Sequence, residues 1–208
     1  HQTSREGRLQ LYFKVVGRGT DILSRVKEGE TVSIFGPLGN GYRIDPMAPS
    51  VIVGGGLGIA PLLFLVKENC RLKKVIADDI LILGAREKAE LEPLLADFKH
   101  FGLSLFTATD DGSHGHRGFV TEVFESLELP DNSTVYCCGP EPMMLGIAKA
   151  LRNAGLDDAQ IKFELFASAQ PGRLKRKVVA NDAASAANQA TAAITLDGAT
   201  QTVTVGKE

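Results

Sequence analysis

One pattern repeats along the middle of the chain, between residues 51 and 166. Short apolar runs alternate with segments in which apolar residues recur every three or four positions. The short runs are typical of buried strands, whereas the longer spacing puts apolar side chains on one face of a helix. The runs cover residues 51–53, 80–83, 103–108, 134–138 and 161–165. The pattern predicts an α/β fold, with a five-stranded parallel, doubly wound sheet and a helix in each of the four crossovers.

Different patterns flank this region. Residues 1–46 hold short strand-like runs, LQLYFKV and part of KEGETVSIFG, with glycine turns and a short helix-like segment between them, which predicts part of an antiparallel β-barrel. Residues 167–190 are basic and then rich in Ala, Ser and Asn, which predicts a linker. Residues 191–208 predict a hairpin around an Asp-Gly dipeptide. Since a lone hairpin is marginal in water, we expect it to begin a further domain, after a middle domain over residues 47–166.

Composition narrows the class of protein. The 208 residues are 44% hydrophobic and 23% charged, which fits a globular chain with its own core. A net charge of −2 disfavours nucleic-acid binding, and no apolar run approaches the roughly 20 residues of a membrane span. Three cysteines without Cys-x-x-Cys spacing suit a reducing compartment, so we expect a cytoplasmic protein without a metal site. The start, HQTSREGRLQ, lacks an initiating Met, and we expect a fragment or a processed chain.

The sharpest local feature is a glycine run after the first strand of the predicted parallel sheet. In VIVGGGLGIAP the glycines are Gly54, Gly55, Gly56 and Gly58, and Pro61 follows at the start of a helix. Glycines let a backbone approach a pyrophosphate, and a helix amino end offers free N–H groups. The run departs from the Gly-x-Gly-x-x-Gly fingerprint at Pro61, and it is not a P-loop. A tight strand-to-helix turn without a ligand is the alternative.

A second candidate is the turn in TVYCCGPEPMM, where a strand ends at Cys138, Gly139 and Pro140. Side chains alternate along a strand, so at most one of Cys137 and Cys138 faces a given ligand. The Cys138 thiol could lie beside a bound ring. No partner is evident that would activate it as a nucleophile, and small core residues are the alternative.

Two more strand ends carry polar residues. Thr109 and Asp110 follow the third strand, where a ribose or an amide could be held, although a solvated Asp/Gly loop explains them equally well. Arg86 follows the second strand, where an Arg binds the extra phosphate of NADP and an acidic residue binds the ribose of NAD. Glu87 and Glu90 lie close behind Arg86, and surface ion pairs account for all three residues as well as cofactor binding does.

These motifs occur in an order that resembles a known family. GGGLGIAP, GAR, CGPEPMM and FELF resemble the ferredoxin–NADP reductase superfamily. KVVGRGT, IFGPLGNGY, VGGGLGIAPL and TDDGSHGHRGFVTEV are more narrowly similar to the electron-transfer subunits of dihydroorotate dehydrogenases, over roughly residues 9–150. The resemblance implies a flavin barrel before a nucleotide domain. Hydride would pass from a nicotinamide to the flavin, which releases electrons singly to an iron–sulfur cluster.

The resemblance also implies cofactor contacts. The FAD pyrophosphate would contact Gly17, Gly19 and Thr20, and residues 36–41 would lie near the flavin. The residues expected to bind NAD(P)H are Gly54, Gly55, Gly56, Gly58, Pro61, Arg86, Thr109, Asp110, Gly139, Pro140 and Met143. Cys138 would flank the nicotinamide, and together with Glu164 it is the candidate catalytic group, tuning the polarity around the rings.

Two departures from the family pattern lead to further expectations. The flavin-binding strand that should precede residue 9 is missing, so we expect this chain alone to retain FAD weakly. The carboxyl-terminal part is similar to reductases with an appended plant-type ferredoxin domain, as in phenylacetyl-CoA oxygenase reductases, whose ligand cysteines would follow Glu208. Three cysteines cannot provide four thiolate ligands, so a [2Fe–2S] cluster is expected only in a longer parent.

The sequence therefore predicts an NAD(P)H-dependent flavin oxidoreductase of the ferredoxin reductase type. It would pass hydride from NAD(P)H to FAD, and electrons on to an iron–sulfur centre or to a partner, an electron-accepting protein or a catalytic subunit, with a hetero-oligomer as one option. The choice between NADH and NADPH and the final acceptor stay open. The alternative is a non-catalytic nucleotide-binding or docking module of a larger complex.

Overall fold

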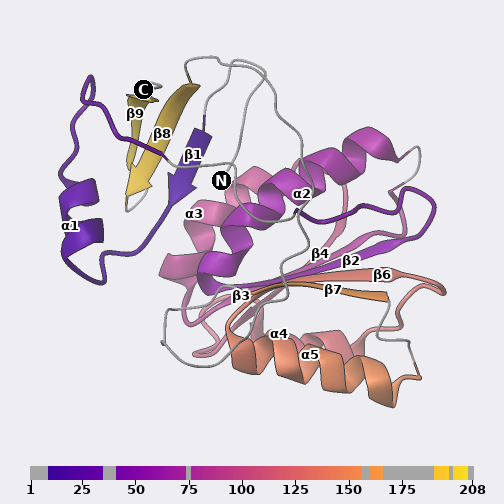
Figure 1. Ribbon diagram of the computed structural model, residues 1–208. Coiled ribbons are helices and arrows are strands. Elements are labelled where there is room, and N and C mark those ends of the chain that lie inside the picture. The colour runs from indigo at the N-terminus through magenta and orange to yellow at the C-terminus, as the bar shows by residue number, and fades with distance from the viewer. Residues whose placement is uncertain are drawn as a thin grey trace, which may run out of the picture.

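Two sheets organise the part of the chain that the structure describes. The computed structural model describes residues 9–34, 41–73, 76–155, 160–165, 190–196 and 199–205. A six-stranded parallel sheet lies between two layers of helices, and a three-stranded sheet lies to one side of it (Figure 1). The predicted α/β class with a parallel sheet is confirmed.

The larger sheet has the strand order β5-β4-β3-β2-β6-β7, and each neighbouring pair is parallel. Its strands are β2 (Ser50–Gly55), β3 (Ile80–Ala85), β4 (Ser104–Thr109), β5 (His116–Arg117), β6 (Thr134–Gly139) and β7 (Ile161–Leu165). The predicted number of five is wrong by one, because β5 was missed. Both residues of β5 are exposed and polar, and they pair with β4 through the backbone alone, so no apolar run marks them.

Helices cover both faces of this sheet. On one face lie α2 (Ile59–Leu72) and α3 (Lys88–Phe98), and on the other lie α4 (Val120–Ser126) and α5 (Glu141–Asn153). These are the four predicted crossover helices. Every residue of β2, β3 and β6 is buried, which explains why these strands have continuous apolar runs rather than alternating ones.

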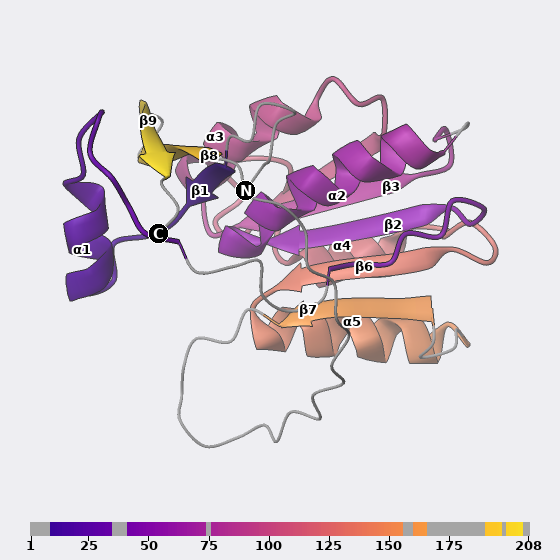
Figure 2. The same ribbon diagram turned by 45° about the horizontal axis from the view of Figure 1, so that its top comes forward.

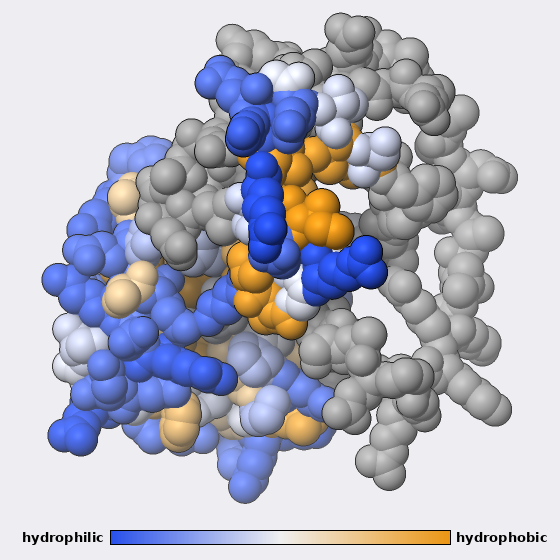
Figure 3. Space-filling view, turned by 90° about the vertical axis from the view of Figure 1, so that its left-hand side faces the viewer, coloured by the Kyte–Doolittle hydropathy of each residue, from blue (hydrophilic) through white to orange (hydrophobic). Residues whose placement is uncertain are grey.

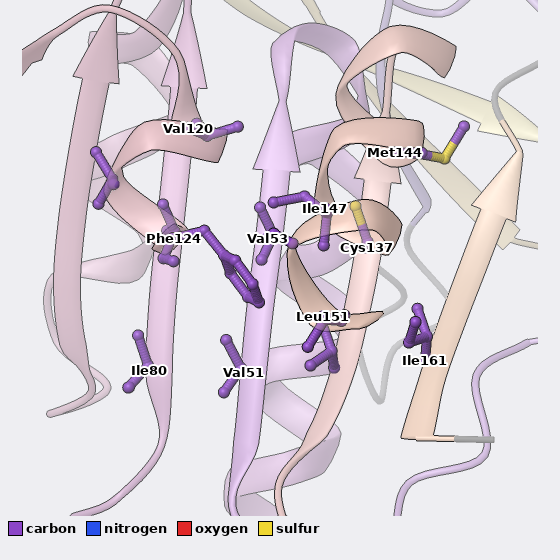
Figure 4. Packing of buried hydrophobic residues seen from close by; sticks show 14 of the residues in the cluster. Val51, Val53, Ile80, Val120, Phe124, Cys137, Met144, Ile147, Leu151 and Ile161 are labelled. Carbon is purple, nitrogen blue, oxygen red and sulfur yellow. The ribbon is translucent and has the colours of Figure 1, made fainter. Parts of the chain in front are cut away.

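The core consists of two clusters, one on each face of the sheet. On the α4–α5 face, Val53 and Cys137 pack with Ile147 (Figure 4). On the α2–α3 face, Tyr136 and Cys138 pack in the second cluster. Consecutive residues of β6 therefore face opposite ways, and the predicted alternation of the two cysteines is confirmed.

The ends of the chain form the smaller sheet. Strand β1 (Leu9–Tyr12) pairs in parallel with β8 (Ala190–Leu196), which pairs antiparallel with β9 (Ala199–Val205). The short helix α1 (Arg18–Ser24) lies beyond β1 (Figure 1). The strand expected within KEGETVSIFG is not found over its described residues, which hold only a single bridge at Thr31. A strand persists only where neighbours take up its backbone hydrogen bonds.

Some expectations about the flanking regions remain predictions. The predicted linker lies almost wholly outside the described residues, as do residues 35–40 and the Asp-Gly dipeptide between β8 and β9. The antiparallel barrel, the four domain boundaries and the ferredoxin character of the last residues therefore stay predictions.

A buried polar network joins α2 to the amino edge of the sheet. The Lys73 ammonium donates to Asp79 Oδ1 at 2.7 Å and to Ser50 Oγ at 2.8 Å. The Asp79 carboxylate also accepts from Asn69 Nδ2 at 2.6 Å and from the Ser50 N–H at 2.7 Å. All four residues are buried, and the bonds hold the end of α2 against the starts of β2 and β3. This edge is opposite to the one that carries the glycine run.

We predict that Lys73→Met lowers the free energy of unfolding by about 3 kcal/mol, because it leaves the buried Asp79 carboxylate without its cation. Arg71→Met is the matched control in the same helix, since it removes an exposed pair with Glu68, and exposed pairs contribute little. Urea denaturation of both variants measures the difference. Equal losses in the two variants would contradict the assigned role.

Candidate functional site

The order of the strands marks one place on the sheet edge. From β2 the chain continues to β3 and β4 on one side, and it later returns to β6 and β7 on the other side. The connections that leave β2 and β6 therefore run to opposite faces, and the edge opens between the carboxyl ends of these two strands. In parallel sheets, ligands bind in the crevice at such a topological switch point.

The glycine run lies at this point. Gly54 and Gly55 end β2, and residues Gly56–Gly58 form the 3₁₀ turn η1, from which α2 begins at Ile59. Gly56 has a φ of +54°, a backbone conformation that is strained for residues other than glycine. A Cβ at this position would meet no atom within 4 Å. The backbone at Gly56 is thus open to a ligand, beside the amino end of α2, whose first N–H groups have no side-chain cap.

The turn after β6 packs directly against the glycine run. A Cβ on Gly58 would lie 2.4 Å from the Cys138 carbonyl oxygen, a backbone atom that cannot move aside. A Cβ on Gly55 would lie 2.5 Å from Met143 Sδ, and one on Gly139 would lie 2.5 Å from Met143 Cε. The structure therefore brings these predicted residues together, because the missing Cβ atoms let the turn after β2 pack against Met143 and the turn after β6. The Cβ position of Gly56 alone among these glycines faces open space, so its backbone, beside the amino end of α2, fits a diphosphate, which needs close approach to backbone N–H groups.

The ends of β3 and β4 meet farther along the same edge. Asp110 N donates to the Ala85 carbonyl at 3.2 Å, next to the exposed Arg86. Thr109 is buried, and its hydroxyl both donates to the His114 carbonyl and accepts from the His114 N–H at 2.9 Å. Arg86 and Asp110 thus lie at the edge as expected, whereas the Thr109 side chain closes the loop after β4. Cofactor contacts by these three residues stay predictions.

For Glu90 the sequence left two options open, a surface ion pair or cofactor binding, and the structure shows an ion pair. Its carboxylate accepts from the Lys14 ammonium and, at 3.4 Å, from the Arg86 N–H. The hydrogen bond from Lys14 holds the pKa of Glu90 below its ordinary value. Sequence reasoning missed Lys14, because the two partners are 76 residues apart and no local pattern connects them.

The two candidate catalytic residues, Cys138 on β6 and Glu164 on β7, are partners in the backbone register of the sheet. The side chain of Glu164 lies outside the described part of the structure. Cys138 is 0% exposed and packs in the core beneath α2, as Cys137 does on the other face. Burial raises the pKa of Cys137 to about 12, so its thiol stays protonated. The proposed roles of Cys138 and Glu164 stay predictions.

Gly17, Gly19 and Thr20, which are predicted to contact FAD, lie at α1, apart from the carboxyl ends of β2 and β6 (Figure 2). The Thr20 hydroxyl accepts from the N–H groups of Val16 and Gly17 at 2.9 and 3.2 Å. A Cβ on Gly17 or Gly19 would meet no atom within 4 Å, so the backbone there is open, and contact with FAD stays a prediction. The face around α1 carries apolar side chains beside hydrophilic ones (Figure 3), and Val16 and Ile22 are among the exposed apolar residues.

A metal site and a membrane-spanning helix are both absent from the described ranges. Within them, no cluster of three or more His, Cys, Asp or Glu side chains is arranged to hold a metal ion. No helix among the same residues has the length and apolarity needed to cross a bilayer.

Comparison with protein families decides the type of domain. The family model described as oxidoreductase NAD-binding domain matches residues 52–149, which run from β2 into α5. The chain belongs to the ferredoxin–NADP reductase superfamily. The matched domain is therefore of a type that binds a nicotinamide dinucleotide in oxidoreductases. The family resemblance seen in the sequence is confirmed.

Individual proteins support this assignment. A protein of Desulforamulus reducens named dihydroorotate dehydrogenase B (NAD(+)), electron transfer subunit, is 39% identical over 74% of this chain and 58% of its own length. A protein of Bacillus caldolyticus with the same name is 36% identical over the same shares. The chain thus spans 58% of the length of these relatives.

Solved structures share the fold. An NADH-dependent reduced ferredoxin–NADP oxidoreductase is 32% identical, with a TM-score of 0.57 over 74% of this chain and 53% of that protein. A flavohemoglobin of Malassezia yamatoensis with bound FAD and heme is 24% identical, with a TM-score of 0.57 over 76% of this chain and 43% of that one, and shows the fold alone.

We predict that iodoacetamide at about pH 8 modifies the half-buried Cys70 slowly in the folded protein and leaves Cys137 and Cys138 intact. Burial raises the pKa of Cys70 and of Cys137, and thiolates are the reactive species. Peptide mass spectrometry with and without denaturant measures the labelling. Rapid labelling of Cys138 in the folded protein would show that its thiol reaches solvent, and would favour a place beside the nicotinamide.

Proposed function

We propose that the chain is the NAD(P)H-oxidising part of a flavin-dependent electron-transfer module. The dinucleotide binds in the crevice between β2 and β6. Its hydride passes to FAD, and electrons continue to an iron–sulfur centre or a partner oxidoreductase. The observation that carries the proposal is the glycine turn at the switch point, where the Gly56 backbone is open beside the amino end of α2, which has no side-chain cap.

The residues of this chain bind and orient the cofactor rather than move protons. The backbone at Gly56, near the amino end of α2, would hold the diphosphate, and Gly139 and Pro140 would lie on the nicotinamide side. FAD, when bound, accepts a hydride and releases electrons one at a time. Direct transfer between stacked rings needs position above all, so no acid or base among the side chains is required.

NADH is the proposed donor. The names of the two relatives specify NAD(+). In this chain the Glu90 carboxylate accepts from the Arg86 N–H, just beyond the end of β3. An acidic residue at this place favours the ribose hydroxyl of NADH over the extra phosphate of NADPH. Arg86 is the competing feature, since an exposed guanidinium there would favour NADPH.

The partner is proposed to be a catalytic subunit in a hetero-oligomer, because the relatives are named as electron-transfer subunits. We assign residues 1–46 to a flavin barrel and residues 191–208 to the start of a plant-type ferredoxin domain. The [2Fe–2S] cluster then belongs to a longer parent, because the three cysteines of this chain cannot ligate it.

We predict that Gly56→Ala raises the Kd for NADH by about tenfold or more, because the new methyl group projects into the open space where the diphosphate approaches. Isothermal titration calorimetry with NADH and with NADPH measures the affinities, and thermal denaturation measures the accompanying loss of stability. The wild-type protein should bind NADH more tightly than NADPH.

Gly102→Ala is the matched control for this variant. Gly102 also has a positive φ, of +74°, and open space at its Cβ position, but it lies between α3 and β4, at the amino edge of the sheet. Both variants should lose similar stability, on the order of 1 kcal/mol for a left-handed residue. Equal NADH affinity in the two variants would contradict the proposed site. Binding without reduction of added FAD would favour a non-catalytic nucleotide-binding module.

A further inference from the structure

Tyr42 connects the segment before β2 to the strand that ends at the crevice. It belongs to residues 1–46, which the proposed function assigns to a flavin barrel, and it lies eight positions before the start of β2. Its hydroxyl donates to the Cys137 carbonyl at 2.9 Å, across 95 positions of sequence. The segment that leads from the flavin side is therefore bonded to β6 within two residues of Gly139.

A second tyrosine holds the same segment. The Tyr136 ring is 0% exposed and meets the Tyr42 ring edge-on, with centroids 5.5 Å apart and an interplanar angle of 88°. The Tyr136 hydroxyl accepts from Asp45 N at 3.1 Å and donates to the Arg43 carbonyl at 3.3 Å. Tyr42 and Ile44 also pack against the core cluster that contains Cys138. Four consecutive residues, 42–45, are thus fixed on β6.

The bonded carbonyl lies next to the tightest contact of the candidate site. Cys137 immediately precedes Cys138, whose carbonyl oxygen lies against the glycine turn at Gly58. Close-packed interiors transmit small displacements, because neighbouring atoms have no free space to absorb them. Residues 42–45 form the flavin-side segment. A shift of this segment relative to β6 therefore changes its position with respect to Gly139 and Pro140.

We propose that Tyr42 is a positioning residue for hydride transfer, whose hydroxyl fixes the flavin-side segment against the nicotinamide side of the crevice. The proposal rests on the proposed function. Transfer between rings depends steeply on their separation and alignment, and a small misplacement costs rate without costing affinity for the dinucleotide. In this proposal Tyr42 acts through its hydrogen bond to the Cys137 carbonyl.

Tyr42→Phe tests the hydroxyl while keeping the ring. With FAD supplied in excess, stopped-flow reduction by NADH should slow roughly three- to tenfold, the effect expected from losing one ordinary hydrogen bond. The charge-transfer absorbance of the nicotinamide–flavin complex should weaken. Hydrogen exchange of the Arg43 and Asp45 amides should speed up without cofactor, whereas the Kd for NADH should stay within about twofold.

Two further variants separate positioning from packing. Tyr42→Ala removes the ring as well, so it should lower both the transfer rate and the melting temperature. Tyr42→Phe keeps the ring, so its melting temperature should stay near that of the wild type while its transfer rate is lowered. Tyr12→Phe makes the same chemical change on the α2–α3 side, next to Leu63 and Leu94, and should leave the transfer rate within about twofold of wild type.

The outcomes distinguish this inference from the proposed function. If wild-type protein fails to reduce FAD with NADH, the proposed function fails. If the wild type is active and Tyr42→Phe transfers hydride at the wild-type rate, the hydroxyl has no positioning role and the inference is overturned. A slower rate with unchanged amide exchange and charge-transfer absorbance would also overturn it, since the segment would not have moved.

Discussion

The close contact between two backbone turns, one after β2 and one after β6, is the constraint on which the rest of the structure depends. At Gly58 the missing Cβ would lie 2.4 Å from a carbonyl oxygen, and at Gly55 and Gly139 the thioether of Met143 takes the space. These contacts fix the turn after β2 and leave the Gly56 backbone open beside the amino end of α2, which favours a ligand that binds N–H groups, such as a diphosphate. This contact lies between β2 and β6, where the order in which the chain adds strands to the sheet reverses.

Stability and function are divided between the two edges of the sheet. The buried Lys73–Asp79 pair and its neighbours hold the amino edge, far from the crevice. At the carboxyl edge the segments before β2 contact the sheet on both sides of the switch point. Lys14 reaches Glu90 on α3, and Tyr42 reaches β6. Electron transfer requires that a flavin half be fixed against a nicotinamide half, and these contacts are where such coupling can occur.

The parts of the fold that local chemistry encodes could be predicted from the sequence. Apolar runs identified β2, β3, β4, β6 and β7, and the glycine run identified the tight turn after β2, where a side chain on Gly58 would clash with backbone. The polar strand β5 carries no such signal. The bonds of Lys14 and Tyr42 cross 76 and 95 positions, and only the tertiary fold brings their partners together. Thr109 shows a further limit, since its position was predicted but the use of its hydroxyl inside the loop was not.

The central claim, that a dinucleotide lies along the glycine turns at the switch point, can be tested by nuclear magnetic resonance. Titration of ¹⁵N-labelled protein with NADH would report on each backbone amide. The account predicts that the largest shifts occur at Gly55, Gly56, Gly58 and Gly139, while the amides of Asn69 and Asp79 at the opposite edge hardly move. Saturable shifts confined to other surfaces, with these glycine signals unchanged, would contradict it.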